Sequence, residues 1–500
     1  MDKDEKISNV IKSIHDYQDK LISDPQLITV VCDFFDFIKD KPVTDADLKF
    51  LHYIACSVGI PHYFDLLEKF GVKTEFSEVD LSTFAASLYE STLHTSLETK
   101  LHKYQKRILD EFDPAQMNKF FLSASTSFGK THIIYEVIKK MNYKNVVLIF
   151  PSVALLAENL EKILSEPKFK EIKDKYSVHT LSDVKALGEN NIFIYTPERF
   201  LSYMEKRRTY INFDFVFIDE IYKIDNTSII QEAEASEDER DVSYRIAAYY
   251  ALMDKADILL AGPYIEGFSL SFKRFLKDYG FRELNYNSYE IVNKTVHDVK
   301  GAKNYPIDDV LSLNFSDSTK KNERLKEMVG AIVKAGESVI VFCRTQTLAE
   351  RYAKGIISGE GVYSTTIKNY SDFTSHIERE FKPDWGVVAA LKKGVGVHHA
   401  SIPKFIQKEI INLFNAGDIR VLFSTTTITE GVNTSAKNLI VTTTMKGDQP
   451  LRRFDAKNIA GVPANVLRYY ENELRPDIRS RFDKYEESIF NRTVKITEKA

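Results

Sequence analysis

The segment with the clearest chemical potential is a loop of small and hydroxyl-bearing residues that ends in a lysine. It runs Ala124-Ser-Thr-Ser-Phe-Gly-Lys-Thr131 between an apolar run and a helical pattern. Backbone N–H groups of such a turn, together with a helix N-terminus, can surround phosphate oxygens. Gly129 would allow close approach, Lys130 would place its charge on the β- and γ-phosphates, and Thr131 would bind Mg²⁺. The loop predicts binding of a nucleoside triphosphate, although Ala124 replaces the usual first glycine.

An acidic pair further along the chain supplies the second half of this chemistry. Asp219-Glu220 directly follows the apolar run Phe213–Ile218, which has the composition of a buried parallel strand. In open α/β sheets the ligand lies beyond the carboxyl ends of the strands, where these carboxylates would sit. We expect Asp219 to bind Mg²⁺ and Glu220 to position or deprotonate the attacking water. The candidate catalytic residues are therefore Lys130, Asp219 and Glu220, and the candidate metal ligands are Thr131 and Asp219.

The composition is that of an ordinary globular protein with more than one domain. The chain has 500 residues, 43% hydrophobic and 28% charged, with a net charge of −4, so any nucleic acid must be bound by a local groove. Cys32, Cys56 and Cys343 lack metal-ligand spacing, and we expect them to be buried in a reducing cytoplasm. The charged N-terminus precedes no apolar segment, and no apolar run is long enough to cross a bilayer. We expect a cytoplasmic protein.

The chain begins with helical patterns and then changes character. Residues 1–98 read as helices at Ile7–Ile22 and Gln26–Lys39, followed by one capped by Thr44. This segment predicts an accessory helical domain to which no chemistry can be assigned. From about residue 100, short apolar runs alternate with amphipathic helices, which indicates a parallel α/β sheet. The expected strands are Phe120–Ser123, Asn145–Phe150, Ile192–Tyr195, Phe213–Ile218 and Ile258–Ala261.

A second series of strands and helices follows residue 300. Its expected strands are Ser338–Cys343, Val421–Ser424 and Leu439–Val441, and its helices include Gln346–Ile357 and Pro403–Asn415. Two consecutive α/β domains, 99–300 and 301–461, are therefore predicted, joined near residues 293–308. Residues 462–500 are expected to form a charged helical tail.

The ordered motifs resemble those of superfamily 2 helicases, and most closely the Ski2-like DExH group. In the first domain the matching segments are Tyr104-Gln105 for the adenine-reading glutamine, Ala124–Thr131 for the P-loop, Pro151–Leu156 for motif Ia, Thr196–Arg199 for motif Ib, Asp219–Tyr222 for motif II and Ala261–Pro263 for motif III. In the second domain they are Val339–Arg344 for motif IV, Gly396–Ala400 for the His-His segment and Ser424–Asn433 for motif V. Ser127 replaces a P-loop glycine, and Tyr222 replaces the usual histidine of motif II.

The resemblance implies two tandem RecA-like parallel-sheet domains with ATP and Mg²⁺ bound between them. The residues it assigns to the nucleotide are Gln105, Ala124, Thr126, Ser127, Gly129, Lys130, Thr131, Gly431 and Asn433. Those it assigns to a nucleic-acid strand are Pro151, Thr196, Arg199, Arg344, Thr425 and Thr426. Contacts of this kind go to phosphates, so binding would be sequence-independent and salt-sensitive, and DNA is not distinguished from RNA. Trp385 is expected to be a packing residue rather than a base-stacking one.

One departure from the family concerns motif VI, which supplies arginine fingers to the γ-phosphate. The corresponding segment, Asn458-Ile-Ala-Gly-Val-Pro-Ala-Asn465, contains no arginine. The chain could be a shortened helicase, a variant in which Arg452, Arg453 or Arg468 substitutes, or a protein that binds ATP and rarely hydrolyses it. Loss of the family pattern after Gly461 favours the first reading.

The P-loop and the long motif V also resemble those of bacterial anti-phage defence helicases, such as the helicase subunit of Hachiman-type systems. That resemblance implies a separate nuclease partner and a preference for DNA. Two alternatives remain open: a non-hydrolysing nucleic-acid sensor or scaffold, and a P-loop switch that binds no nucleic acid.

Overall fold

The chain forms two compact units in the computed structural model, Met1–Asn293 and Lys294–Ala500. The structure describes residues 3–39, 41–96, 99–124, 128–206, 211–221, 239–253, 255–262, 270–287, 289, 295–299, 304–307, 311–315, 321–358, 370–381, 385–429, 436–446, 449–450 and 465–468.

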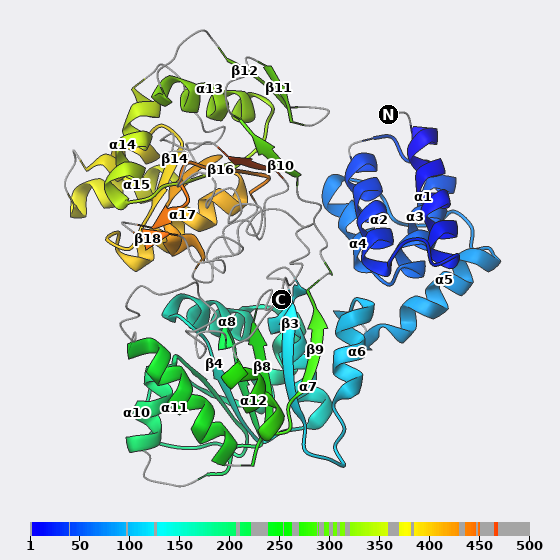
Figure 1. Ribbon diagram of the computed structural model, residues 1–500, viewed down its shortest axis with the longest axis vertical. Helices are drawn as coiled ribbons and strands as arrows, with labels where there is room; N and C mark the ends of the chain where they lie inside the picture. The colour runs from blue at the N-terminus through cyan, green and yellow to red at the C-terminus, as the bar shows by residue number, and fades with distance from the viewer. Residues whose placement is uncertain are drawn as a thin grey trace. The chain divides into compact units, whose positions relative to one another are not determined.

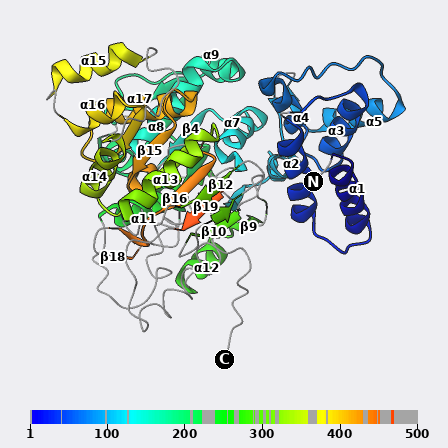
Figure 2. The same cartoon turned by 90° about the horizontal axis from the view of Figure 1, so that it is seen from above.

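A group of helices opens the first unit (Figures 1 and 2). These helices are α1 (Lys3–Gln18), α2 (Asp24–Ile38), α3 (Asp45–Ser57), α4 (His62–Leu66) and α5 (Leu81–Thr92). Local capping explains where α3 begins, because the Asp47 carboxylate accepts the Thr44 N–H at 2.8 Å and Thr44 Oγ1 accepts the Asp47 N–H at 3.3 Å. The predicted helix over 7–22 is wrong at both ends. The chain leaves the helix before Lys20, whose φ is +60°, a left-handed conformation that no α-helix contains.

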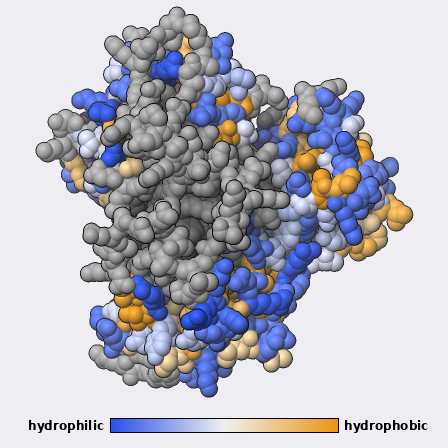
Figure 3. Space-filling model, viewed as in Figure 1, coloured by the Kyte–Doolittle hydropathy of each residue, from blue (hydrophilic) through white to orange (hydrophobic). Residues whose placement is uncertain are grey.

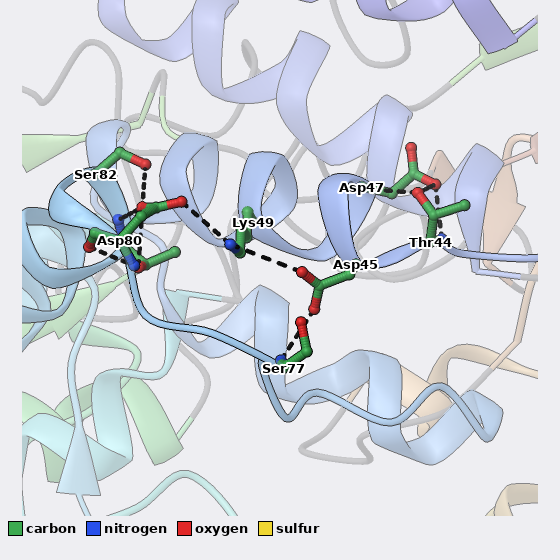
Figure 4. A network of polar contacts seen from close by, with 8 residues as sticks. Thr44, Asp45, Asp47, Lys49, Ser77, Asp80 and Ser82 are labelled. Carbon is green, nitrogen blue, oxygen red and sulfur yellow. Dashed lines mark hydrogen bonds and ion pairs between the residues drawn. The ribbon is translucent and has the colours of Figure 1, made fainter.

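Helices α3 and α5 are joined near their N-termini by a network of exposed polar side chains (Figure 4). Lys49 Nζ lies 3.2 Å from the Asp80 carboxylate and 3.7 Å from the Asp45 carboxylate. Asp45 in turn accepts the Ser77 N–H at 3.0 Å. Such exposed ion pairs contribute little to the free energy of unfolding, so the network adds little to the stability of the contact between α3 and α5. Apolar residues also gather on the surface of this helical region (Figure 3), among them Leu81, Phe84 and Leu88 on α5.

The rest of the first unit is built on a parallel sheet of seven strands in the order β5-β6-β4-β7-β8-β3-β9. The strands are β3 (Lys119–Ala124), β4 (Asn145–Ile149), β5 (Ser177–His179), β6 (Asn191–Tyr195), β7 (Phe215–Ile218), β8 (Asp257–Gly262) and β9 (Arg282–Tyr286). The helices that accompany them are α6 (Lys103–Glu111), α7 (Lys130–Met141), α8 (Val153–Ser165), α9 (Lys170–Lys175), α10 (Pro197–Lys206), α11 (Glu239–Met253) and α12 (Leu270–Asp278). Every residue of β7 and every residue of β4 except Asn145 is buried, as expected when helices cover both faces of a parallel sheet.

The second unit is built on a parallel sheet of six strands in the order β10-β19-β16-β13-β15-β14. The strands are β10 (Thr295–Asp298), β13 (Val339–Phe342), β14 (Val395–His398), β15 (Val421–Ser424), β16 (Asn438–Val441) and β19 (Asn465–Arg468). The helices are α13 (Lys321–Lys334), α14 (Gln346–Ile357), α15 (Ser371–Glu380), α16 (Gly386–Leu391) and α17 (Lys404–Ala416). Three short antiparallel pairs complete the described strands: β1 (His94–Ser96) with β2 (Thr99–Lys100), β11 (Asn304–Pro306) with β12 (Ser312–Asn314), and β17 (Met445–Lys446) with β18 (Gln449–Pro450).

The predicted architecture, two parallel α/β sheets preceded by helices, is confirmed. All eight strands expected from the sequence are present with small differences in their ends. The sequence does not predict the other five strands of the two parallel sheets, β5, β9, β10, β14 and β19, or the three antiparallel pairs. The three cysteines are buried and free, and Trp385 packs against the core of the second unit beside Phe381.

Candidate functional site

The predicted phosphate loop connects β3 to α7, as the sequence indicates. Ala124 ends the strand, Gly129 is the N-cap of α7 with φ +77°, and Lys130 begins the helix. Only glycine adopts this left-handed conformation without strain. A β-carbon at position 129 would lie 2.5 Å from Gln105 Nε2. The loop therefore requires glycine both for its backbone angle and for the approach of Gln105.

Lys130 is almost fully buried at the start of α7. Its ammonium donates a hydrogen bond to the Ala124 carbonyl at 3.1 Å, across the mouth of the loop. Burial lowers the pKa of Lys130, and the negative charges of Asp219 and Glu220 oppose that shift. A buried cation is costly unless anions compensate it. Phosphate oxygens in the loop would provide that compensation, so the site has the electrostatic character of an anion-binding site.

Asp219 and Glu220 stand at the carboxyl end of β7, where the sequence predicts them. The Asp219 N–H donates to the Ile149 carbonyl at 3.0 Å, and Asp219 Oδ1 accepts the Glu220 N–H at 3.0 Å. Glu220 has a φ of +55°, a left-handed conformation that costs a residue with a side chain about 1–2 kcal/mol. Strain of this kind concentrates at functional sites. The turn holds both carboxylates beyond the edge of the sheet that carries the loop.

Gln105 links the helix α6 to the phosphate loop. Its Nε2 donates to the Phe128 carbonyl at 3.0 Å, and its Oε1 accepts the His102 N–H at 3.1 Å. His102 Nδ1 accepts the Gln105 N–H at 3.2 Å, so Nε2 carries the proton and donates to the same Phe128 carbonyl at 3.2 Å. Burial, with a further contribution from His62, lowers the pKa of His102 to about 3, so the imidazole is neutral. Two side chains thus fix the carbonyl that precedes Gly129.

The N-terminal helices contact this same element. Asp24, in the first turn of α2, accepts hydrogen bonds from the Lys103 ammonium and the Tyr104 hydroxyl at the start of α6. The Lys103 N–H also donates to the Gly59 carbonyl at 2.9 Å. The sequence contains no signal for these contacts. His102, by contrast, could have been found, because it stands three residues before Gln105 in a capping pattern.

Two further loops of the first unit carry residues predicted to contact nucleic acid. Pro151 is buried just after β4. Thr196, after β6, accepts the Arg199 N–H through Oγ1 at 3.4 Å and so caps α10. Arg199 donates from Nη1 to the Thr180 carbonyl at 3.1 Å. All three lie at the carboxyl edge of the sheet, the same edge as Lys130 and Asp219.

The second unit brings its predicted residues together at the carboxyl ends of β13, β14 and β15. Arg344 follows β13, and the buried residues Thr425 and Thr426 follow β15. The Thr425 N–H donates to the His398 carbonyl at 3.3 Å, which ties the end of β15 to that of β14.

His398 was not predicted as a site residue, yet it ends β14, an outermost strand of the sheet, directly beside the residues that follow β15. Its Nδ1 is 3.1 Å from Thr427 Oγ1 and 3.4 Å from Ser424 Oγ, and burial lowers its pKa to about 4. The neighbouring His399 contacts Glu350 through Nε2 at 3.0 Å. The consecutive histidines within the Gly396–Ala400 motif were the signal available in the sequence.

Several predicted residues lie outside the described part of the chain. They are Thr126, Ser127, Tyr222, Pro263, Gly431, Asn433, Arg452, Arg453, residues 458–464 of the motif VI segment and residues 469–500 of the predicted tail.

Comparison with known families decides what this arrangement belongs to. The family model of the DEAD/DEAH box helicase matches residues 102–242, and that of the helicase conserved C-terminal domain matches residues 320–458. The chain therefore contains a DEAD/DEAH box helicase domain and a helicase conserved C-terminal domain. The first match contains the phosphate loop and the Asp219-Glu220 pair, and the second contains the edge formed by Arg344, His398 and Thr425.

Proteins similar to this chain come from bacteria and eukaryotes. Anti-bacteriophage protein B of Escherichia coli (strain K12) is 27% identical over 361 residues, 72% of this chain and 45% of the relative. The probable ATP-dependent DNA helicase HFM1 of Xenopus tropicalis is 31% identical over 141 residues, and the DExH-box ATP-dependent RNA helicase DExH11 of Arabidopsis thaliana is 29% identical over 129. These two matches cover 27% and 24% of the chain and 10% and 9% of the relatives. The chain thus matches less than half the length of each of these relatives.

The described residues of the first unit fit a nucleoside triphosphate. Gly129 leaves the space that a β-carbon would fill, and Lys130 is a buried cation near the carboxylates of Asp219 and Glu220. Thr131 is half-buried in the first turn of α7 and offers a hydroxyl, while Asp219 offers a carboxylate; both are oxygen donors suited to Mg²⁺. Among the described residues, no helix combines the length and apolarity needed to cross a membrane.

Proposed function

We propose that the chain is an ATP-dependent nucleic-acid helicase or translocase that acts in anti-phage defence. The observation that carries this proposal is the buried Lys130 ammonium at the phosphate loop, opposed by the carboxylates of Asp219 and Glu220. Such a set binds a triphosphate and positions water against it. In the proposed division, residues 1–98 form the accessory helical domain and two motor domains follow. The sequence predicts 301–461 for the second motor domain and a helical tail from 462, but β10 (Thr295–Asp298) and β19 (Asn465–Arg468) pair within the second sheet. We therefore assign residues 295–468 to that domain.

In this proposal each residue of the loop has a separate task. Lys130 holds the β- and γ-phosphates, and Thr131 and Asp219 hold Mg²⁺, which neutralises charge that develops on the phosphates. Glu220 orients the attacking water and accepts its proton. Gln105 holds the loop through the Phe128 carbonyl and reads the adenine. Residues outside the described part, Ser127 and Gly431 among them, complete the nucleotide site.

In this proposal each unit contacts the nucleic-acid strand at the carboxyl edge of its own sheet. Thr196 and Arg199 supply donors from the first unit, and Arg344, Thr425 and Thr426 supply them from the second. These groups contact phosphates and so bind strands of any sequence. Because Arg199 already donates to the Thr180 carbonyl, it would have to exchange or share that bond. Weakening by salt, with a slope set by the number of phosphates neutralised, is the expected signature.

The role in defence rests on the similarity to Anti-bacteriophage protein B. Because this chain covers only 45% of that relative, its partners are also proposals. We assign it a nuclease subunit as partner, DNA as its nucleic acid and the cytoplasm as its location. ATP turnover would then control access of the nuclease to invading DNA.

The rival function is a sensor that binds ATP and nucleic acid but does not hydrolyse ATP. The absence of arginine from Asn458–Asn465 favours it, because arginine fingers accelerate phosphoryl transfer by about 10³–10⁵. ATP turnover of the full chain, with and without single-stranded DNA, separates the two. Stimulated turnover that Lys130→Ala abolishes, and that Lys206→Ala at the exposed end of α10 leaves intact, supports the helicase. Tight ATP binding with no turnover above that of Lys130→Ala supports the sensor.

A third reading, a P-loop switch without nucleic acid, is tested by filter binding of labelled single-stranded DNA. The helicase retains the strand at low salt and loses it as salt increases. No retention at low salt would leave only the switch.

A further inference from the structure

A compact group of metal-ligating side chains lies in the helical region, far along the chain from the nucleotide site. His52 and Cys56 stand one turn apart on α3 and face Glu90 on α5. His52 Nε2 lies 2.9 Å from Glu90 Oε2 and 3.5 Å from Cys56 Sγ, and Cys56 Sγ lies 4.0 Å from Glu90 Oε2. Among the described residues this is the one group of three or more such side chains with ligand atoms that close together.

The triangle formed by these three atoms matches one face of a zinc tetrahedron. Zinc bonds of about 2.0–2.3 Å to nitrogen, oxygen and sulfur place neighbouring ligands about 3.3–3.8 Å apart. The Cys56–His52 distance falls within that range, and the Cys56–Glu90 distance exceeds it slightly. The His52–Glu90 distance is that of a hydrogen bond and would open by about half an ångström around the ion. Small rotations of two side chains would complete the face.

The surroundings supply a fourth donor and a support for the carboxylate. His94 Nε2 is buried, makes no hydrogen bond and lies 3.5 Å from Glu90 Oε1. It is not among the ligand atoms that lie within 4.8 Å of one another, so the His94 side chain has to rotate toward the other three to become the fourth ligand. Lys100 Nζ contacts that same oxygen at 2.5 Å, and Asp65 accepts Lys100 at 2.8 Å. Glu90 Oε2 therefore faces His52 and Cys56, while Glu90 Oε1 is held by the Lys100 ammonium. Metal-ligating carboxylates are commonly oriented by such hydrogen bonds.

We propose that His52, Cys56 and Glu90, with His94 as the fourth ligand, bind a structural zinc ion that fastens α3 to α5. Two imidazole nitrogens, one thiolate sulfur and one carboxylate oxygen form a borderline-soft donor set. This set suits zinc and excludes magnesium and calcium. The charges also balance. Zn²⁺ is neutralised by one thiolate and one carboxylate, and Lys100 is neutralised by Asp65.

Zinc binding in this site has a defined proton balance. Cys56 is buried, so without metal its sulfur is a thiol. The ion takes the sulfur lone pair as the S–H bond breaks, and that proton goes to the solvent. Without metal, His52 Nε2 donates its proton in the hydrogen bond to Glu90 Oε2. When Nε2 binds the ion through its lone pair, that hydrogen bond breaks and the single proton of the imidazole is carried by Nδ1 instead. No oxidant or reductant is involved.

The site explains an asymmetry in how α3 and α5 are joined. Near their N-termini the two helices meet through the exposed Lys49, Asp45 and Asp80 network (Figure 4), which contributes little stability. Glu90, near the end of α5, meets the buried face of α3 instead. A metal ion there would provide the strong connection that surface pairs do not.

The test is a cobalt titration of the full chain after removal of metal, followed by absorption spectroscopy. Cobalt replaces zinc in such sites, and a thiolate ligand produces a sulfur-to-cobalt charge-transfer band. Cobalt at the proposed Mg²⁺ site produces no such band, because that site contains no sulfur. We expect the band to saturate at one cobalt per chain, to disappear on addition of zinc, and to accompany release of a proton.

Cys56→Ser is expected to abolish the band and to weaken cobalt binding by more than about tenfold, the loss that follows even from removing a supporting group. Cys32→Ser, at a buried cysteine of α2, is the matched control and keeps the band. A wild-type chain without the band overturns the proposal even if the variants fail to fold. So does a band that survives Cys56→Ser. Neither result bears on ATP turnover, which tests the proposed function separately.

Discussion

Gly129 and Gln105 allow the geometry of the phosphate loop to be tested with two substitutions. Gly129→Ala places a methyl group on a backbone with φ +77° and 2.5 Å from Gln105 Nε2. The backbone strain costs about 1–2 kcal/mol. Displacing the Gln105 amide breaks its bonds to the Phe128 carbonyl and the His102 N–H, each worth about 0.5–1.5 kcal/mol. The total is about 2–5 kcal/mol.

Calorimetry of the nucleotide-free chain measures this cost as a lower melting temperature. For a unit of this size, 1 kcal/mol corresponds to about 2 °C, so Gly129→Ala should lower the transition by about 4–10 °C. In a Gln105→Ala background the methyl group meets no amide, and only the backbone strain remains, about 2–4 °C. The difference is the coupling between the two residues.

Gly71→Ala supplies the control for backbone strain alone. Gly71 has a φ of +80°, and a β-carbon there meets nothing within 4 Å, so its cost should equal that of Gly129→Ala in the Gln105→Ala background. The reasoning is refuted if Gly129→Ala costs the same with and without Gln105, or if it costs no more than Gly71→Ala.

Two further predictions concern the first unit. Asp24→Asn weakens the hydrogen bonds to Lys103 and Tyr104, each worth about 1.5–3 kcal/mol when one partner is charged. Hydrogen exchange in residues 103–111 should therefore accelerate, whereas Asp19→Asn, at an exposed position, should leave it unchanged. Equal exchange in the two variants would contradict the stabilisation of α6 by Asp24. Burial lowers the pKa of His62 to about 4 and that of His102 to about 3, from 6.5, so the unfolded chain binds more protons below pH 6.5. The stability is full above that pH and is lost as the pH falls toward 4, by up to about 1.4 kcal/mol per histidine and pH unit. A melting temperature that stays constant from pH 7 to pH 5 would exclude this.

The sequence predicts the central strands of both sheets well because those strands are continuous apolar runs. The edge strands are not predicted, because their sequences are not continuous apolar runs. In β9 only Leu284 is buried, so the segment reads as polar. In β14 all four residues are buried, but Gly396 and His398 interrupt the apolar run. Glycine is required at position 396, because a β-carbon there would lie 2.8 Å from Ile419 and 2.9 Å from Ile410. The strand predicted from Phe213 begins at Phe215, because the Asp214 carboxylate accepts the N–H groups of Lys144 and Asn145 at 2.8 Å.

The candidate sites divide in a similar way. Residues at strand ends, such as Lys130, Asp219 and Thr425, could be located because parallel strands present their carboxyl ends at one edge. Residues whose partners lie far away in the sequence could not be located. Asp24 reaches α6 from a helix about eighty residues earlier, and Cys56 meets Glu90 only once α3 and α5 are packed.

The most direct test of the central claim is ATP turnover by the full chain carrying Glu220→Gln at saturating single-stranded DNA. The substitution removes the proposed base and leaves Lys130 and the phosphate loop in place. Turnover should fall about a hundredfold or more relative to Glu205→Gln, an exposed glutamate on α10, because general bases contribute about 10²–10⁴. ATP affinity should remain unchanged. Equal turnover in the two variants would contradict the claim that Asp219 and Glu220 complete an ATP-hydrolysing site.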